Sequence, residues 1–183
     1  MYNIFVSESP KQSTHDQVNQ PGPEDKIFFY PKEFYVFDNF SSFSVEYNGY
    51  VWPTSEHAYQ AAQFKGYSDK VIKEIKKSRS AHDTQKIADK HKKLRNPKWC
   101  EIKKDIMKDI LRCKVEQHPY VLKKLIASKD REIIEDSWRD EIWGWGPYKD
   151  GQNLLGNLWM EIRDEFTEKL IIKDTRAHCY NGK

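Results

Sequence analysis

The chain has 183 residues, of which 38% are hydrophobic, 32% charged and 14% aromatic. These proportions are typical of a soluble globular domain whose core is rich in aromatic side chains. The net charge of +3 is too small to indicate a nucleic-acid binder, so an anion site has to be local. Three scattered cysteines, with neither a signal pattern nor a membrane-spanning apolar run, predict a cytoplasmic protein with reduced thiols, no metal and no membrane association.

Strand and turn signals come first in the chain. Residues 1–25 are polar, contain a Pro-Gly-Pro turn and show no periodicity, which predicts a flexible N-terminal extension. Residues 27–30 and 43–47 have strand-like composition, and Asn48-Gly49 is typical of the tight turn of a β-hairpin. We therefore expect a small antiparallel β-sheet.

Helical signals dominate the remainder. Thr54 or Ser55 is a suitable N-cap for a first helix, and Asn153 for a last one. Apolar residues spaced three and four apart from Trp99 to Cys113 predict a long core helix. Shorter elements are expected at residues 71–77, from residue 80, at residues 120–127, and at the β-compatible pair Ile133-Ile134.

This order of elements predicts the fold class. Strands followed mostly by helices favour a single compact, mostly helical α+β domain with a small antiparallel β-sheet. We expect this domain at residues 26–173, with a C-terminal tail at residues 174–183.

The first helix carries more polar side chains than a helix needs. Glu56, Tyr59, Gln60 and Gln63 share one face because residues three, four and seven apart are neighbours on a helix. Glu56 lies in the first turn, where the helix dipole favours its ionised form, so it suits a base or a stabiliser of positive charge. A purely helix-stabilising acid would have the same position, and both interpretations stay open. Lys65 falls almost on the opposite side, as a dipole complement unless the chain turns back.

Two further segments are candidates for ligand binding. Carboxylates, glycines and tryptophans in residues 135–156 suit a pocket for a planar ring attached to a sugar, although a Gly-rich turn with core tryptophans explains them equally well. The basic residues 90–98 form either a solvated surface or a phosphate site. Arg95 is the preferred phosphate ligand because its planar fork matches phosphate oxygens.

The order of these motifs resembles the NADAR (YbiA-like) family. The resemblance covers about residues 27–172, and the family often has Ser where this chain has Asp38. It is carried by residues 37–41, Trp52 to His57, Tyr59, Gln60, Lys65, Trp99, Met107, Asp136, Trp143-Gly144, residues 151–156 and Arg163.

The resemblance implies a cofactor-free and metal-independent N-glycosidase that cleaves a bond between ribose C1 and nitrogen. The implied substrate is a phosphoribosylamino-pyrimidine of the riboflavin pathway. One alternative is a hydrolase that removes ADP-ribose from guanine in nucleic acid. Others are a non-catalytic module that binds ADP-ribose or a NAD metabolite, and a structural protein without a ligand. The oligomeric state is open.

The resemblance also implies roles for individual residues. Glu56 and Asp136 are the candidates for acid–base and charge-stabilising roles, because cleavage of a glycosidic bond builds positive charge on the sugar. Lys65 is an expected electrostatic partner or an amine nucleophile toward the opened ribose. The expected substrate-binding residues are Asn39, Trp52, His57, Tyr59, Gln60, Arg95, Trp99, Trp143, Gly144, Asn153 and Arg163.

Overall fold

The computed structural model describes residues 25–29 and 34–180, with side-chain surroundings up to residue 173. Nearly all of the predicted N-terminal extension, and Tyr30 of the first predicted strand, therefore lie outside the described residues. The helices and strands are β1 (Lys26–Phe29), η2 (Tyr35–Phe37), β2 (Val45–Tyr47), β3 (Tyr50–Trp52), α1 (Ser55–Ala62), α2 (Asp69–Lys76), α3 (Ala81–Lys90), η3 (Lys92–Leu94), α4 (Trp99–Gln117), α5 (Pro119–Ala127), β4 (Glu132–Glu135) and α6 (Leu154–Tyr180).

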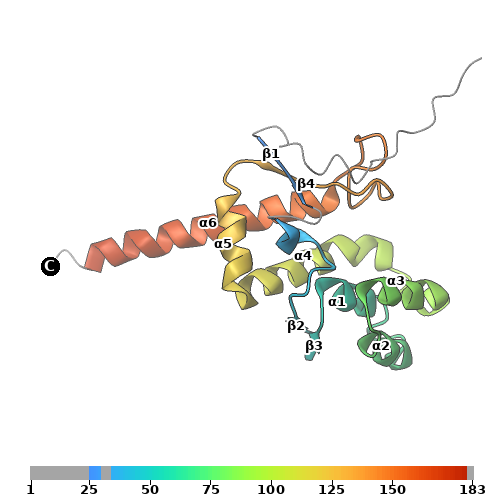
Figure 1. The fold of residues 1–183 in the computed structure, drawn as a ribbon. Coiled ribbons are helices and arrows are strands. Elements are labelled where there is room, and N and C mark those ends of the chain that lie inside the picture. The colour runs from blue at the N-terminus through green and yellow to red at the C-terminus, as the bar shows by residue number, and fades with distance from the viewer. Residues whose placement is uncertain (1–24, 30–33, 181–183) are drawn as a thin grey trace, which may run out of the picture.

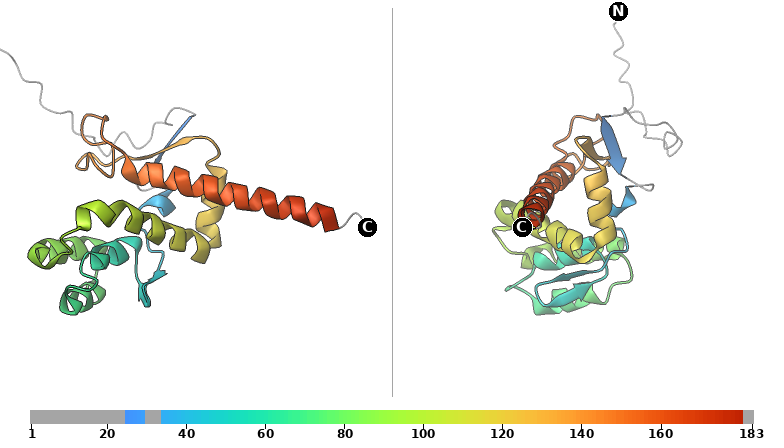
Figure 2. Two further views of the ribbon diagram at one scale, coloured as in Figure 1. Left: turned by 180° about the vertical axis from the view of Figure 1, so that it is seen from behind. Right: turned by 90° about the vertical axis from the view of Figure 1, so that its left-hand side faces the viewer.

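The arrangement is mostly helical, which confirms the predicted α+β class. The long α6 lies alongside α4, and α5 stands at the C-terminal end of α4 and packs against α6, while α1, α2 and α3 pack together on the other side of α4 (Figures 1 and 2). The C-terminal part of α6 extends beyond the other elements (Figure 2) and reaches Tyr180, within the segment that the sequence predicts as a tail. In the described part of the chain, no helix combines the length and the apolar character needed to cross a membrane.

The β2–β3 hairpin forms as predicted. Val45 pairs with Trp52 and Tyr47 with Tyr50 in an antiparallel ladder. The two turn residues Asn48 and Gly49 both have positive φ, at 53° and 77°. Such a turn matches the natural twist of paired strands, which explains why Asn-Gly signals a hairpin.

The β1 strand does not join this hairpin, contrary to the sequence expectation of one antiparallel sheet. It pairs in parallel with β4, with Ile27 opposite Ile133 and Phe29 opposite Glu135. The partner strand lies far along the sequence, so turn signals between neighbouring segments carry no information about it. The pairing ends at Glu135, and therefore positions the first residues of the loop that follows β4.

The N-terminus of α6 locks onto β4. Asn153 occupies the expected N-cap position with φ 48°, but its side chain bonds β4 instead of capping the helix. Its Nδ2 donates to the carbonyl of Ile133 at 2.8 Å, and its Oδ1 accepts from the amide of Glu135 at 3.0 Å. A Cβ atom on Gly156 would lie 2.0 Å from the carbonyl oxygen of Ile133, so only glycine permits this contact between helix and strand.

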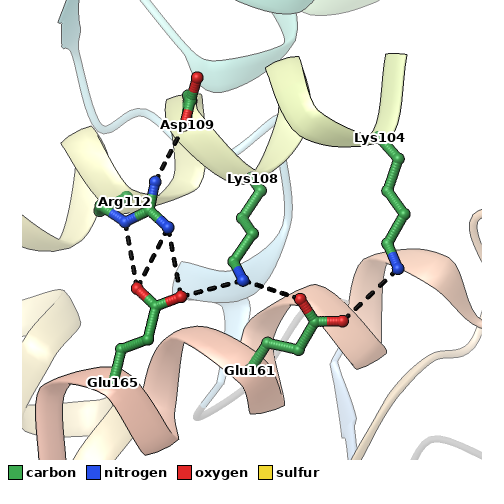
Figure 3. Close-up of polar contacts among 6 residues, drawn as sticks. All are labelled: Lys104, Lys108, Asp109, Arg112, Glu161 and Glu165. Atoms are coloured by element: carbon green, nitrogen blue, oxygen red, sulfur yellow. Dashed lines mark hydrogen bonds and ion pairs between the residues drawn. The ribbon is translucent and has the colours of Figure 1, made fainter. Parts of the chain in front are cut away.

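A charge network joins the exposed sides of α4 and α6 (Figure 3). Lys108 Nζ lies 2.9 Å from carboxylate oxygens of both Glu161 and Glu165, and Arg112 Nη2 lies 3.1 Å from Glu165 Oε2. Lys104 contacts Glu161 at 3.5 Å. The rows of opposite charge hold the two helices in register on the outside of the core.

Candidate active site

A cavity of about 730 Å³ lies among the turn after η2, the helices α1, α3 and α4, and the loop after β4. The turn is held in place by the side chain of Lys114, which belongs to α4 and is fully buried. Its Nζ donates to the carbonyl of Asp38 at 3.0 Å and to Ser41 Oγ at 2.8 Å. Burial lowers the pKa of Lys114 to about 7. This turn places Asn39 in the lining of the cavity.

Glu56 enters the cavity from the first turn of α1. Thr54 caps the helix by accepting from the amide of His57 at 3.3 Å, and the amide of Glu56 donates to the carbonyl of Asn39 at 3.1 Å. Glu56 Oε1 accepts from Gln60 Nε2 at 2.7 Å and from Gln85 Nε2 at 2.9 Å. Helix start, turn and carboxylate are therefore held together by hydrogen bonds.

Burial dominates the protonation of Glu56. The residue is only 4% exposed, and desolvation raises its pKa to about 7, although the amide donors of Gln60 and Gln85 favour the ionised form. The helix dipole favours the ionised form, as the sequence indicates, whereas burial shifts the equilibrium toward the protonated form. Glu56 can therefore exchange a proton near neutral pH.

Glu135, at the end of β4, also lines the cavity, together with Asp38, Asp89 and Asp140. Burial, followed by the nearby charges of Asp140, Asp38 and Glu56, raises the pKa of Glu135 to about 8. Its buried Oε2 has no hydrogen-bond partner among the described residues. Glu135 is thus a protonated acid at neutral pH and is free to donate.

Asp136, the residue expected from the sequence, is not in the cavity lining. Its Oδ1 accepts from Trp145 Nε1 at 2.9 Å. Successive side chains of an extended segment point in opposite directions, so only one of Glu135 and Asp136 can face the cavity. The sequence could not decide between them, because Ile133 and Ile134 are both buried and mark neither face as internal.

Aromatic side chains form one wall of the cavity, and they include Tyr59, Trp99 and Trp143 from the expected substrate-binding residues. The ring of Tyr59 lies 5.0 Å from that of Trp99 and 5.5 Å from that of Trp143, in tilted and edge-to-face arrangements. Asp140, which sequence analysis did not select, positions Trp143 by accepting from its amide at 2.8 Å. Burial raises the pKa of Tyr59, so its phenol stays neutral. The wall offers flat surfaces for a planar ring.

Cationic side chains also reach the cavity. Arg95, the phosphate ligand expected from the sequence, lines it, and its buried Nε has no partner among the described residues. The nearest carboxylate oxygen to Arg95 Nη2 is that of Asp89, at 3.9 Å. Lys103 and Arg139, which the sequence did not single out, line the same cavity. The Nε of Arg95 therefore keeps a donor that no described residue uses.

Lys65 is exposed and lies away from Glu56. Its Nζ donates to Asn48 Oδ1 at 2.7 Å, at a second cavity of about 200 Å³ between the hairpin and the alanine-rich face of α1. Trp52 lines this second cavity and not the larger one. The helical geometry that places Lys65 opposite Glu56 thus holds in the fold.

The remaining expected ligands support the site from outside it. His57 is buried and shares a hydrogen bond of 2.8 Å between its Nδ1 and Thr54 Oγ1. Arg163 Nη1 donates to Ser128 Oγ at 3.0 Å and to the carbonyl of Arg131 at 2.7 Å. Gly144 accepts at its carbonyl from the amide of Asn153, 2.9 Å away. No cluster of three metal-ligating side chains occurs within the described ranges.

The fold and the cavity define a small α+β domain in which three carboxyl groups with raised pKa values, Asp38, Glu56 and Glu135, lie beside an aromatic wall. The NADAR domain matches residues 27–167. The chain is 35% identical over 130 residues to N-glycosidase YbiA of Escherichia coli strain K12, which covers 70% of this chain and 79% of that protein. It therefore belongs to the NADAR domain family, and the resemblance seen in the motifs is confirmed.

Other relatives extend this comparison. The NMR structure of Escherichia coli YbiA superposes with a TM-score of 0.73 at 30% identity, and covers 85% of this chain and 93% of that one. A riboflavin biosynthesis protein of Vibrio vulnificus is 31% identical over 147 residues, which are 79% of this chain and 40% of that protein. An N-glycosidase of Nostoc punctiforme is 29% identical over 147 residues, 79% of this chain and 94% of that protein.

Proposed function

We propose that this protein hydrolyses the bond between ribose C1 and the amine nitrogen of a phosphoribosylamino-pyrimidine. The observation that carries the proposal is the pair Glu56 and Glu135, two carboxyl groups with raised pKa values in one cavity. The enzyme class follows from the family, whose relatives are named N-glycosidases. The chain is accordingly a hydrolase acting on N-glycosyl bonds.

The chemistry needs a proton donor and a stabilising charge. Glu135 is protonated at neutral pH and donates its proton to the leaving nitrogen as the C1–N bond breaks. Ionised Glu56 stabilises the positive charge that develops on the sugar, and then accepts a proton from the water that attacks C1. Water thus supplies a hydroxyl group to C1, and the nitrogen leaves with one added proton. Glu56 then returns its proton to solvent as Glu135 is reprotonated.

The rest of the cavity supports a ribosyl phosphate with a planar base. Tyr59, Trp99 and Trp143 provide surfaces on which a pyrimidine stacks, and Arg95 provides a guanidinium for the phosphate, with an Nε unpartnered among the described residues. The volume of about 730 Å³ is in the range of small-molecule sites. The name of the Vibrio relative, a riboflavin biosynthesis protein, favours a substrate from that pathway.

Removal of ADP-ribose from guanine in nucleic acid is the second candidate. It uses the same ribosyl–nitrogen chemistry, and the presence of Lys103 and Arg139 beside Arg95 favours it, because a diphosphate needs more than one cation. A non-catalytic module would bind ADP-ribose without hydrolysing any substrate.

The test compares two substrates at equal concentration. The purified protein is incubated with a phosphoribosylamino-pyrimidine and, separately, with guanine-ADP-ribosylated DNA, and the released base and sugar are quantified. We expect ribose 5-phosphate from the first substrate. Faster turnover of the second would transfer the assignment to the second candidate, and folded protein that binds ADP-ribose without turnover would establish the binding module. Turnover of neither substrate, without binding, contradicts all three.

A further inference from the structure

The cavity concentrates buried polar atoms that lack a partner. Six such side-chain atoms occur among the described residues, and four belong to residues that line this cavity. They are Asn39 Oδ1, Gln63 Oε1, Glu135 Oε2 and Arg95 Nε. Because buried polar atoms in proteins are nearly always hydrogen-bonded, a cluster of this kind indicates a surface complementary to a ligand.

The orientation of Gln63 is determined by Glu56. A carboxylate only accepts hydrogen bonds, so Gln60 has to turn its Nε2 toward Glu56 Oε1, 2.7 Å away. Gln60 Oε1 is then left as an acceptor, and it receives the Nε2 of Gln63. The same relay therefore leaves Gln63 Oε1 as an unpaired acceptor.

Gln63 has little freedom to satisfy this acceptor by moving. The residue is 2% exposed, and its own carbonyl accepts from the amide of Asn96 at 2.8 Å. Asn39, another residue of the cavity lining, is similar. It is 7% exposed, its Nδ2 faces Met107 Sδ at 3.5 Å, and its Oδ1 is unpaired. Two buried amide oxygens of cavity-lining residues are thus left without a partner in the described part of the chain.

The position of Gln63 indicates which part of a ligand it meets. Gln63 follows Tyr59 by four residues, so the two share the face of α1 that carries the aromatic wall. Resting on the proposed function, we propose that Gln63 is a specificity-determining residue. Its Oε1, aided by Asn39 Oδ1, accepts hydrogen bonds from amino groups on the stacked base and so selects amine-rich pyrimidines.

Binding of free bases tests this without any turnover. Calorimetry with diaminouracil and with uracil measures the preference of the wild-type protein for the amine-bearing ring. We expect wild type to prefer diaminouracil, and Gln63→Met to reduce that preference roughly five- to tenfold, the scale of a lost hydrogen bond. Gln117→Met is the matched control: Gln117 bonds the backbone of Glu46 outside the cavity, and this variant should keep the wild-type preference.

Three results would overturn the inference. The first is a wild type that binds both bases equally, and the second is a folded Gln63→Met variant with an unchanged preference. The third is a Gln63→Met variant that loses affinity only for ribose 5-phosphate and not for the free bases. The last would assign the acceptor to ribose hydroxyls. If Gln63→Met does not fold, the base preference of Gln63→Leu, compared with that of the wild type, tests the same inference. Failure of the hydrolysis assay with a Gln63-dependent preference rejects only the proposed reaction, whereas hydrolysis without that preference rejects only the role of Gln63.

Discussion

At the scale of single residues, the cavity turns ordinary carboxyl groups into groups that titrate near neutrality. Glu56 and Glu135 both have pKa values raised by burial, to about 7 and about 8. The charge of Glu56 also contributes to the raised pKa of Glu135. The productive form, with Glu56 ionised and Glu135 protonated, is most populated between these two values.

This predicts a bell-shaped pH profile for kcat/KM with a maximum between about pH 7 and 8. Glu56→Gln should lower kcat roughly a hundredfold, the usual scale for a lost acid–base group, because the amide can neither stabilise positive charge nor accept a proton. The Gln side chain still offers an oxygen to Gln60 and Gln85, so folding should persist. Steady-state kinetics over pH 5 to 10 and a thermal melt check both statements. A melting temperature several degrees lower, with nearly unchanged kcat, would instead support the helix-stabilising role.

At the scale of elements, the contact between α6 and β4 positions Glu135. Gly156→Ala should destabilise the protein by about 3 kcal/mol, because the added Cβ would overlap the carbonyl of Ile133 and force the helix from the strand. Activity should fall as well, since β4 ends at Glu135. Glu168→Ala, at an exposed position of the same helix, should change stability by less than about 0.5 kcal/mol. Denaturant titration distinguishes them, and equal effects would contradict this packing argument.

The charge network between α4 and α6 predicts acid sensitivity. Lys108 and its neighbours lower the pKa of Glu161, and Arg112 followed by Lys108 lowers that of Glu165, relative to an ordinary value of 4.5. The folded state therefore binds fewer protons than the unfolded state, so this stabilisation is present above about pH 4.5 and is lost as the pH falls through the lowered values. Both pairs are partly exposed, so each contributes less than about 1 kcal/mol.

The double variant Glu161→Gln/Glu165→Gln isolates this contribution. At pH 7 it should melt roughly 2 to 4 °C below wild type, and the difference should shrink at pH 3 and in 1 M salt. A difference independent of pH and salt would show that packing of the two side chains, and not their charge, holds the helices together.

At the scale of the whole molecule, the site lowers stability at high pH. Glu135 is raised from 4.5 to about 8, so the folded state binds more protons than the unfolded state in that interval and stability falls as the pH rises through it. Glu135→Gln removes the penalty and should raise the melting temperature by roughly 4 °C or more at pH 9, with little gain at pH 4. The lowered pKa of Lys114 has the opposite effect, because it makes stability rise with pH between about pH 7 and 10.5. Comparison of the variant with wild type at each pH therefore cancels its effect, and an equal gain at both pH values would contradict the argument.

The sequence by itself determined the features that depend on neighbours along the chain. Asn48-Gly49 specified the hairpin turn, Thr54 capped α1, apolar spacing marked α4, and the order of short motifs identified the family. The helix face shared by Glu56, Tyr59 and Gln63 also followed from spacing alone. These signals are readable because turns, caps and helix faces form between residues only a few positions apart.

The tertiary structure alone decided what depends on residues far apart in the chain. It paired β1 with β4, brought Glu135 instead of Asp136 to the cavity beside Glu56, and used Asn153 to hold a strand instead of capping a helix. It also raised the pKa of Glu56 to about 7, because a pKa depends on how much water and which charges surround the group. Such surroundings are assembled by packing, and no local pattern in the sequence contains them.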